Sequence, residues 1–190
     1  MKILSGVYRG RNLTYSPKFS LRPSLSRIRK MVFDTLMPLI FNKDWNDVKI
    51  LDCFAGTGSY GFEALSNVGG HCTFLEMERE MIKAIKTTAT NININDKTNV
   101  IWGNSITSIK KLHDPFHLIF LDPPYEKTFL ITKLLKKLLA QGNIDENSLI
   151  IVENSTHNKW NFIPDDFLII KDKIASSTRF MILKLNVNNQ

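Results

Sequence analysis

The sequence predicts an α/β protein built on a doubly wound, mostly parallel sheet. Short apolar segments that suit buried strands alternate along the chain with segments of helical periodicity. A glycine-rich turn follows the first of these strands, and the turn Leu-Asp-Pro-Pro-Tyr closes the fourth, at residues 121–125. In sheets of this kind ligands bind at the carboxyl ends of the strands, close to the point where the strand order reverses.

Residues 1–21 hold a short apolar stretch, a Gly-Val-Tyr-Arg-Gly turn and a Ser/Pro/Lys segment, which suit a small hairpin or a loose arm. A helix is expected to begin near Ser24, a suitable N-cap, and to end at Pro38. Its apolar face would contain Leu25, Ile28, Val32 and Leu36, with Arg27 and Lys30 directed elsewhere. We therefore expect residues 1–36 to form a basic extension and residues 37–190 the main domain.

The main domain reads as alternating strands and helices that end in a hairpin. Strands are expected at 49–54, 72–77, 99–103, 116–122 and 148–153, with the hairpin strands at 167–173 and 179–187. Helices are expected at 59–68, 78–91, 105–112 and 128–140. Gly69 and Gly70 should end the first of these helices, and the lysines of the last should face water.

The net charge of +7 is concentrated near the N-terminus. Eight basic residues precede the first acid, Asp34: Lys2, Arg9, Arg11, Lys18, Arg22, Arg27, Arg29 and Lys30. The rest of the chain, with 17 basic and 18 acidic residues, is close to neutral. Unopposed arginines with tyrosines between them favour a phosphate-backbone partner. The alternatives are a solvated tail or an arm folded on its own domain.

Several classes of protein do not fit the composition. No apolar run approaches the roughly 20 residues of a membrane span, and the start is too short in apolar residues for a secretory signal. Cys53 and Cys72 cannot build a disulfide framework, so we read them as buried core residues of a cytoplasmic protein. The four histidines lack metal-ligand spacing, so no metal is expected. We also expect a monomer.

A nucleotide-type cofactor site is predicted at the sequence DCFAGTGSYG. Gly56, Gly58 and Gly61 match the pattern G-x-G-x-x-G, which suits NAD, FAD or S-adenosylmethionine and also occurs in turns without a ligand. Asp52, at the end of the strand before these glycines, suits a ligand with an amine or another cationic group better than a pyrophosphate. Glu76, at the end of the next strand, can accept hydrogen bonds from ribose hydroxyls, a device that nicotinamide enzymes share.

The Asp-Pro-Pro-Tyr turn favours chemistry on an exocyclic base amine. The lone pair of such an amine is delocalised into the ring, and two acceptors aimed at its N–H bonds would localise it on nitrogen. The Asp122 carboxylate and the Pro123 carbonyl can supply these acceptors, and Pro123 and Pro124 fix the backbone that holds them. Tyr125 would offer a face on which an extruded base stacks. The plain alternative is a β-turn after a strand.

The chain as a whole resembles the RsmD family, bacterial methyltransferases that modify guanine N2 in small-subunit ribosomal RNA. The stretches that carry the resemblance are ILSGVYRGRNL, LRPSLSRIRKMVFDTL, ILDCFAGTGSYGFEAL, FLEME, FLDPPYE and SLIIVENS, in that order. The last two strands match only loosely. The arm, with G-x-x-R-G-R, R-P-S and R-x-R, is the most specific part, because many amino-methyltransferases share the other motifs.

The resemblance implies a seven-stranded, Rossmann-like domain that uses S-adenosylmethionine, with residues 1–36 as an RNA-contacting extension. It assigns to the cofactor pocket Asp52, Phe54, Gly56, Gly58 and Glu76. Asn104 stands where the family usually has an acid near the adenine amine, and its amide oxygen can still accept. Asp122, which borders this pocket, and Tyr125 would hold the guanine amine. The residues that would face RNA are Arg9, Arg11, Arg22 and Arg27. Lys30 stands where the family commonly has an acidic residue.

The hypothesis from sequence is methyl transfer from S-adenosylmethionine to the N2 amine of a guanine in 16S ribosomal RNA, either free or within the small ribosomal subunit. The alternatives are a DNA adenine or cytosine amino-methyltransferase, a non-catalytic RNA-binding assembly protein, and a nicotinamide oxidoreductase.

Overall fold

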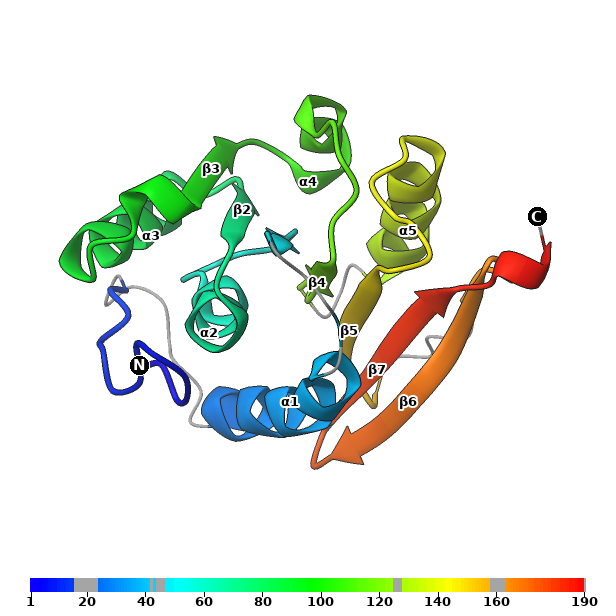
Figure 1. The fold of residues 1–190 in the computed structure, drawn as a ribbon, viewed down its shortest axis with the longest axis horizontal. Coiled ribbons are helices and arrows are strands. Elements are labelled where there is room, and N and C mark those ends of the chain that lie inside the picture. The colour runs from blue at the N-terminus through cyan, green and yellow to red at the C-terminus, as the bar shows by residue number, and fades with distance from the viewer. Residues whose placement is uncertain (16–23, 42, 44–46, 125–127, 158–162, 190) are drawn as a thin grey trace.

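The computed structural model describes residues 1–15, 24–41, 43, 47–124, 128–157 and 163–189 of the chain, and the statements below refer to these residues. Its centre is a seven-stranded sheet with the order β3-β2-β1-β4-β5-β7-β6 (Figure 1). The strands are β1 (Lys49–Asp52), β2 (His71–Glu76), β3 (Thr98–Trp102), β4 (Leu118–Leu121), β5 (Leu149–Ser155), β6 (Phe167–Ala175) and β7 (Thr178–Leu185).

The first five strands are mutually parallel, and β7 pairs antiparallel with both β5 and β6. This arrangement confirms the predicted mostly parallel sheet and the closing hairpin. The strand order reverses between β1 and β4, because the chain first builds outward through β2 and β3 and then returns. Ligand sites of doubly wound sheets lie at this position, beyond the carboxyl ends of the two strands.

Helices cover both faces of the sheet. Figure 1 shows α1 (Ser24–Ile40), α2 (Ser59–Val68) and α3 (Arg79–Asn91) on one side, and α4 (Ser105–Ser108) and α5 (Phe129–Ala140) on the other. Each side has its own apolar core, and strand residues contribute to the two cores alternately, as the pleat requires. Cys53 and Cys72 are free and buried, one in each core, as the sequence predicted.

Helix α1 confirms the predicted apolar face but not the predicted end. Ile28, Val32 and Leu36 are buried, and the side chain of Leu25 lies outside the described set. The expectation that Pro38 ends the helix is wrong, because α1 continues to Ile40 with Pro38 inside it. A proline this close to the C-terminal end of a helix removes only one backbone hydrogen bond. The hydrogen bond from Phe41 N–H to the Met37 carbonyl, which spans Pro38, is intact at 3.0 Å.

The N-terminal segment, residues 1–14, is folded against α2. A bridge between Lys2 and Asn12 closes it, and Ile3 and Leu13 are buried in the same core as α1 and α2. The Glu63 carboxylate of α2 accepts hydrogen bonds from Leu4 N–H at 2.9 Å and from Ser5 N–H at 2.8 Å. The segment is therefore part of the folded domain, although the proposed boundary after residue 36 is a functional division that stays a prediction.

Of the six N-terminal cations that the structure describes, two are paired with acids, which corrects the picture of a wholly unopposed basic arm. Arg29 is buried, with its Nε 3.2 Å from Glu63 Oε2 and its Nη2 donating to the Lys2 carbonyl at 2.7 Å. Lys30 lies 2.7 Å from Asp34 one helical turn away on the surface. Arg29 thus ties the N-terminal segment to α1 and α2 and is not available to an external partner.

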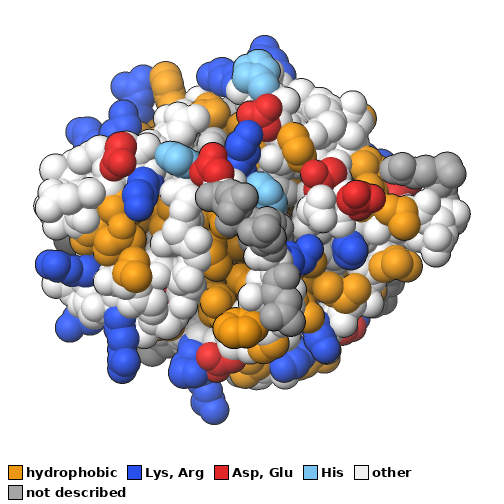
Figure 2. Space-filling model, viewed as in Figure 1, with side chains coloured by type: hydrophobic (Ala, Val, Ile, Leu, Met, Phe, Trp, Pro, Cys, Tyr) orange, Lys and Arg blue, Asp and Glu red, His pale blue; other side chains and the backbone are white. Residues whose placement is uncertain are grey.

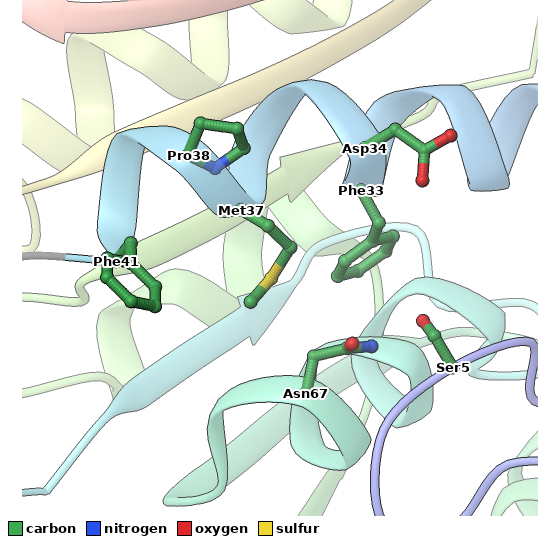
Figure 3. A pocket seen from close by; sticks show the side chains of 7 residues that line it. All are labelled: Ser5, Phe33, Asp34, Met37, Pro38, Phe41 and Asn67. Carbon is green, nitrogen blue, oxygen red and sulfur yellow. The ribbon is translucent and has the colours of Figure 1, made fainter.

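A hollow of about 610 Å³ lies on the surface between α1 and α2. Figure 3 shows its lining side chains, which come from both helices and from the N-terminal segment: Ser5, Phe33, Asp34, Met37, Pro38, Phe41 and Asn67. Asn67 belongs to the last turn of α2, whereas the glycine-rich turn precedes the first turn of that helix. The hollow is therefore separate from the carboxyl edge of the sheet.

Candidate cofactor and acceptor site

Four carboxylates meet at the carboxyl edge of the sheet, on the side covered by α1, α2 and α3. Asp52 ends β1, Glu76 ends β2, Asp122 follows β4 directly, and Glu153 lies in the second half of β5. Their neighbours two positions earlier, Ile50, Phe74, Phe120 and Ile151, all belong to the core on that side. Because side chains alternate along a strand, the four carboxylates are directed to one face.

Asp52 is fixed at the floor of the glycine-rich turn. Its side chain is only 3% exposed, and its Oδ2 accepts a hydrogen bond from Gly61 N–H in α2 at 3.0 Å. Burial, with a smaller contribution from the nearby charge of Glu76, raises the pKa of Asp52 to about 7, although the Gly61 bond opposes this. A cation at this position would favour the ionised carboxylate, as expected for a ligand with an ammonium or sulfonium group.

Each glycine of the turn is favoured for its own structural reason. Gly56 and Gly58 have φ angles of +53° and +76°, which favour glycine, and Gly58 forms the N-cap of α2. At Gly61 an added Cβ would lie 2.3 Å from the Phe74 ring of β2, so α2 can approach the sheet only with glycine there. The structure therefore brings Asp52 and the three glycines together, as the motif predicted.

Glu76 has more backbone partners than the sequence indicated. Its Oε2 accepts from Gly56 N–H at 2.7 Å, and its Oε1 accepts from Met77 and Glu78 N–H at 2.7 and 2.8 Å. A carboxylate offers about four lone-pair positions, and three are used here to fix the turn against β2. Accepting both ribose hydroxyls as well would require one of these bonds to be shared or exchanged.

Two further predicted pocket residues lie near the same edge. Phe54, after β1, is half-buried against the core on the α5 side of the sheet. Asn104 is the N-cap of α4, and its Oδ1 accepts from Ile106 N–H at 2.9 Å. The amide oxygen that was expected to meet an adenine amine is therefore already engaged once, and the proposed cofactor contact has to use its second lone pair.

The acceptor turn begins with Asp122, which is half-buried, and continues with a buried Pro123 and an exposed Pro124. Tyr125 lies outside the described residues. Burial, followed by the charges of Glu153 and Asp52, raises the pKa of Asp122 well above its ordinary value. The electrostatic interaction of Asp122 with Asp52 supports the expectation that the acceptor turn and the glycine-rich turn face one site.

Sequence reasoning did not single out Glu153 and Tyr60. Glu153 is 2% exposed, its Oε2 accepts a hydrogen bond from the Tyr60 hydroxyl of α2, and its Oε1 has no hydrogen-bond partner among the residues that the structure describes. The Tyr60 ring stacks on Phe120 of β4 with centroids 5.2 Å apart. A signal was present, since LIIVE ends its apolar run in an acid as LIFLD does, but the 93 positions between the partners hid their contact.

The arginines assigned to RNA divide into exposed and undescribed ones. Arg9 and Arg11 in the N-terminal segment and Arg27 in α1 are exposed, whereas Arg22 lies outside the described residues. Figure 2 shows Lys and Arg side chains along the left and lower edges of the view, where Figure 1 has α3, the N-terminal segment and α1, and also along the upper edge and on the right. The described cations on the α2 side of the sheet are therefore part of a wider distribution.

No group of three or more His, Cys, Asp or Glu side chains is arranged to hold a metal ion within the described part of the chain. Among the helices described, none combines the length and the apolar character needed to cross a membrane.

Several known proteins are similar to this chain over nearly its whole length. The ribosomal RNA small subunit methyltransferase D of Escherichia coli K12 is 28% identical over 182 residues, which cover 96% of this chain and 88% of that protein. The protein of the same name from Haemophilus influenzae is 32% identical over 186 residues, covering 96% and 92%. A solved structure described as a putative methyltransferase from Escherichia coli superposes with a TM-score of 0.83 at 27% identity, covering 98% of each chain.

The fold is accordingly that of Rossmann-like class I methyltransferases. The model of the family described as conserved hypothetical protein 95 matches residues 1–184, nearly the whole chain. The chain therefore belongs to this family, which is the RsmD family that its sequence resembles.

Proposed function

We propose that this protein transfers a methyl group from S-adenosylmethionine to the N2 amine of a guanine in 16S ribosomal RNA. The observation that carries the proposal is the meeting of two turns at the β1–β4 switch point, the glycine-rich turn with Asp52 and the proline turn with Asp122. The names of the relatives, ribosomal RNA small subunit methyltransferase D, support the substrate class.

The residues of the glycine-rich turn fit S-adenosylmethionine. When bound, this cofactor supplies an electrophilic methyl group on a sulfonium. Asp52 would face a cationic part of it, because a buried carboxylate whose pKa is raised to about 7 gains most from a positive partner. Gly58, as the N-cap of α2, has no side chain that could cap the helix, so the N–H groups of Ser59 and Tyr60 would be available to a ligand, whereas Gly61 N–H is donated to Asp52. Glu76 and Asn104 would bind the ribose and the adenine.

The acceptor turn would prepare the guanine amine. The Asp122 carboxylate and the Pro123 carbonyl would each accept a hydrogen bond from one N–H group of the amine. The nitrogen lone pair would then point at the methyl group. The base would stack on Tyr125. As the N–CH₃ bond forms, the S–CH₃ bond of the cofactor would break with its electron pair going to sulfur, so that the neutral thioether S-adenosylhomocysteine leaves. One N–H proton would pass to Asp122 or water, while its electron pair stays on nitrogen. No covalent enzyme intermediate is needed in this scheme.

The direct test is labelled methyl transfer. The protein is incubated with radiolabelled S-adenosylmethionine and 16S ribosomal RNA, both free and within assembled small subunits, and the nucleosides are identified by mass spectrometry. We expect label in N2-methylguanosine. Label on adenine or cytosine, or on a DNA control, would replace this proposal with the amino-methyltransferase alternative. Thermal shift separates the remaining alternatives, because stabilisation by NAD alone, or by neither cofactor, contradicts a methyltransferase.

The proposed RNA contact has its own test. Replacing Arg9 and Arg11 by Gln should lower the slope of log affinity against log salt by about 1.4 to 1.8, because two phosphate contacts are lost. The double variant Lys136→Gln, Lys137→Gln removes two exposed cations from α5, on the other face of the sheet, and should leave the slope unchanged. Equal slopes for wild type and the arginine variant would mean that the N-terminal segment does not contact RNA.

A further inference from the structure

The carboxyl edge of the sheet contains a pair of neighbouring acids, the half-buried Asp122 and the buried Glu153, that the proposed reaction does not yet explain. The register of β4 and β5 places Leu121 opposite Val152, so Asp122, directly after the end of β4, comes next to Glu153 of β5. Neighbouring strands are about 4.8 Å apart. Both side chains are directed to the α2 side of the sheet, as the alternation of the preceding core residues shows.

Glu153 is too buried to touch a substrate. It is 2% exposed, and its enclosed Oε1 has no hydrogen-bond partner among the described residues. An enclosed carboxylate oxygen without a donor is costly, and two interacting carboxylates cannot both be ionised without a further cost. Both costs are relieved when the pair holds one proton.

The other groups around the pair define its electrostatic setting. Tyr60 of α2 donates to Glu153 Oε2, Asp52 of β1 interacts with Asp122, and Arg29 of α1 acts on Tyr60. Across the sheet, the β7 residue opposite Glu153 is the apolar Phe180. Burial raises the pKa of Glu153, while the Tyr60 bond acts in the opposite direction.

We propose that Glu153 is a positioning residue that shares one proton with Asp122, and that Tyr60 controls which of the two acids holds it. With the proton on Glu153, Asp122 is an anion that accepts from the substrate amine. With the proton on Asp122, that acceptor is lost. Glu153 thereby sets the lower pH limit of the acceptor turn. The inference rests on the proposed function for its meaning, but the proton distribution is a property of the protein without ligands.

The test follows the ionisation of Asp122 directly in the free protein. Aspartate labelled with ¹³C at the carboxyl group is titrated by NMR, and the Asp122 signal is assigned by its loss in Asp122→Asn. Glu153→Gln is neutral at every pH, so Asp122 should ionise at lower pH than in wild type, by roughly one pH unit. Tyr60→Phe removes a donor that favours ionised Glu153, so it should shift the Asp122 midpoint in the same direction.

Controls separate this role from a structural one. Glu146→Gln removes an exposed carboxylate in the loop before β5 and should leave the Asp122 midpoint unchanged. Thermal unfolding identifies any variant that fails to fold, and the two variants provide independent tests. If Asp122 titrates as in wild type in folded Glu153→Gln or Tyr60→Phe, the inference is overturned.

Activity supplies a second measurement. In methyl-transfer assays the acid limb of kcat/KM should move to lower pH in both variants, because Asp122 stays ionised further into the acid range. A purely structural role would lower the rate without moving the limb. Absence of any methyl transfer by the wild-type protein would contradict the proposed function, whereas the NMR titration would still decide the proton sharing.

Discussion

The carboxyl edge of the sheet has two halves that treat their acids differently. In the cofactor half, Glu76 receives three backbone N–H bonds and Asp52 receives one, so both are built into the turn. In the acceptor half, Glu153 has a single hydroxyl donor, and its other oxygen has no hydrogen-bond partner among the described residues. The difference is that backbone donors fix the acids of the first half in the turn, whereas the buried acid of the second half is only partly satisfied.

The largest effect is expected from a substitution that changes the acceptor half alone. Asp122→Ala should reduce methyl transfer by about 10²–10³-fold, because one of two acceptors for the amine is lost. The affinity for S-adenosylmethionine, measured by calorimetry, should change by less than about threefold, since the N–H donors of the glycine turn are untouched. Wild-type activity in this variant would contradict the assignment, and a large loss of affinity would mean that the halves are not separable.

The next effect belongs to the cofactor half. Asp52→Asn should weaken binding of S-adenosylmethionine by about 10- to 100-fold, because a charged hydrogen bond to the ligand becomes a neutral one. In wild type, affinity should also fall below pH 7, by up to about tenfold per pH unit, because protonated Asp52 must first lose its proton. The variant should lack this dependence, and calorimetry at pH 5.5, 7 and 8.5 compares the two.

The pH dependence of the unfolding free energy of the protein without ligand should also depend on Asp52. The pKa of Asp52 is raised from 3.8 to about 7, so the folded state binds more protons than the unfolded state between these values. The free energy of unfolding should therefore be highest below pH 4 for this group, and fall by a few kcal/mol as the pH rises to 7. Urea unfolding of Asp52→Asn should show a smaller fall. An identical pH profile in the variant would show that Asp52 is not the cause.

The smallest effect compares two glycines of one turn. Gly58→Ala should cost about 1–2 kcal/mol of unfolding free energy, since a residue with φ of +76° is strained and its Cβ would lie 2.8 Å from the Phe62 ring. Gly56→Ala should cost less, because φ is +53° and an added Cβ meets nothing within 4 Å. Denaturant midpoints at constant slope measure both, and the reverse order would contradict the packing argument.

Local chemistry explains why most of the fold could be predicted from the sequence. The limits of α2 were predicted correctly because Gly58 and Gly69 mark both ends with positive φ angles. The end of α1 was predicted wrongly because a proline near a helix terminus removes only one hydrogen bond. The packing of the helix against the core can offset this cost, and the sequence pattern alone does not show that packing.

Contacts between distant residues account for what the sequence did not reveal. Arg29 read as one more free cation, whereas it pairs with Glu63, 34 positions away. Tyr60 and Glu153 read as ordinary members of a helix and a strand. Pairings of this kind depend on the register between elements, which residue patterns within each element do not encode.

Helix α2 contacts both the glycine-rich turn and the N-terminal segment. Its first turn holds Asp52 through Gly61, and its later residues Glu63 and Ser66 anchor the segment that carries Arg9 and Arg11. Gly61 and Ser66 are five residues apart, which is about 7.5 Å along the helix. Under the proposed function, this short rigid element would keep a constant spacing between the proposed cofactor site and the N-terminal segment as the proposed RNA contact.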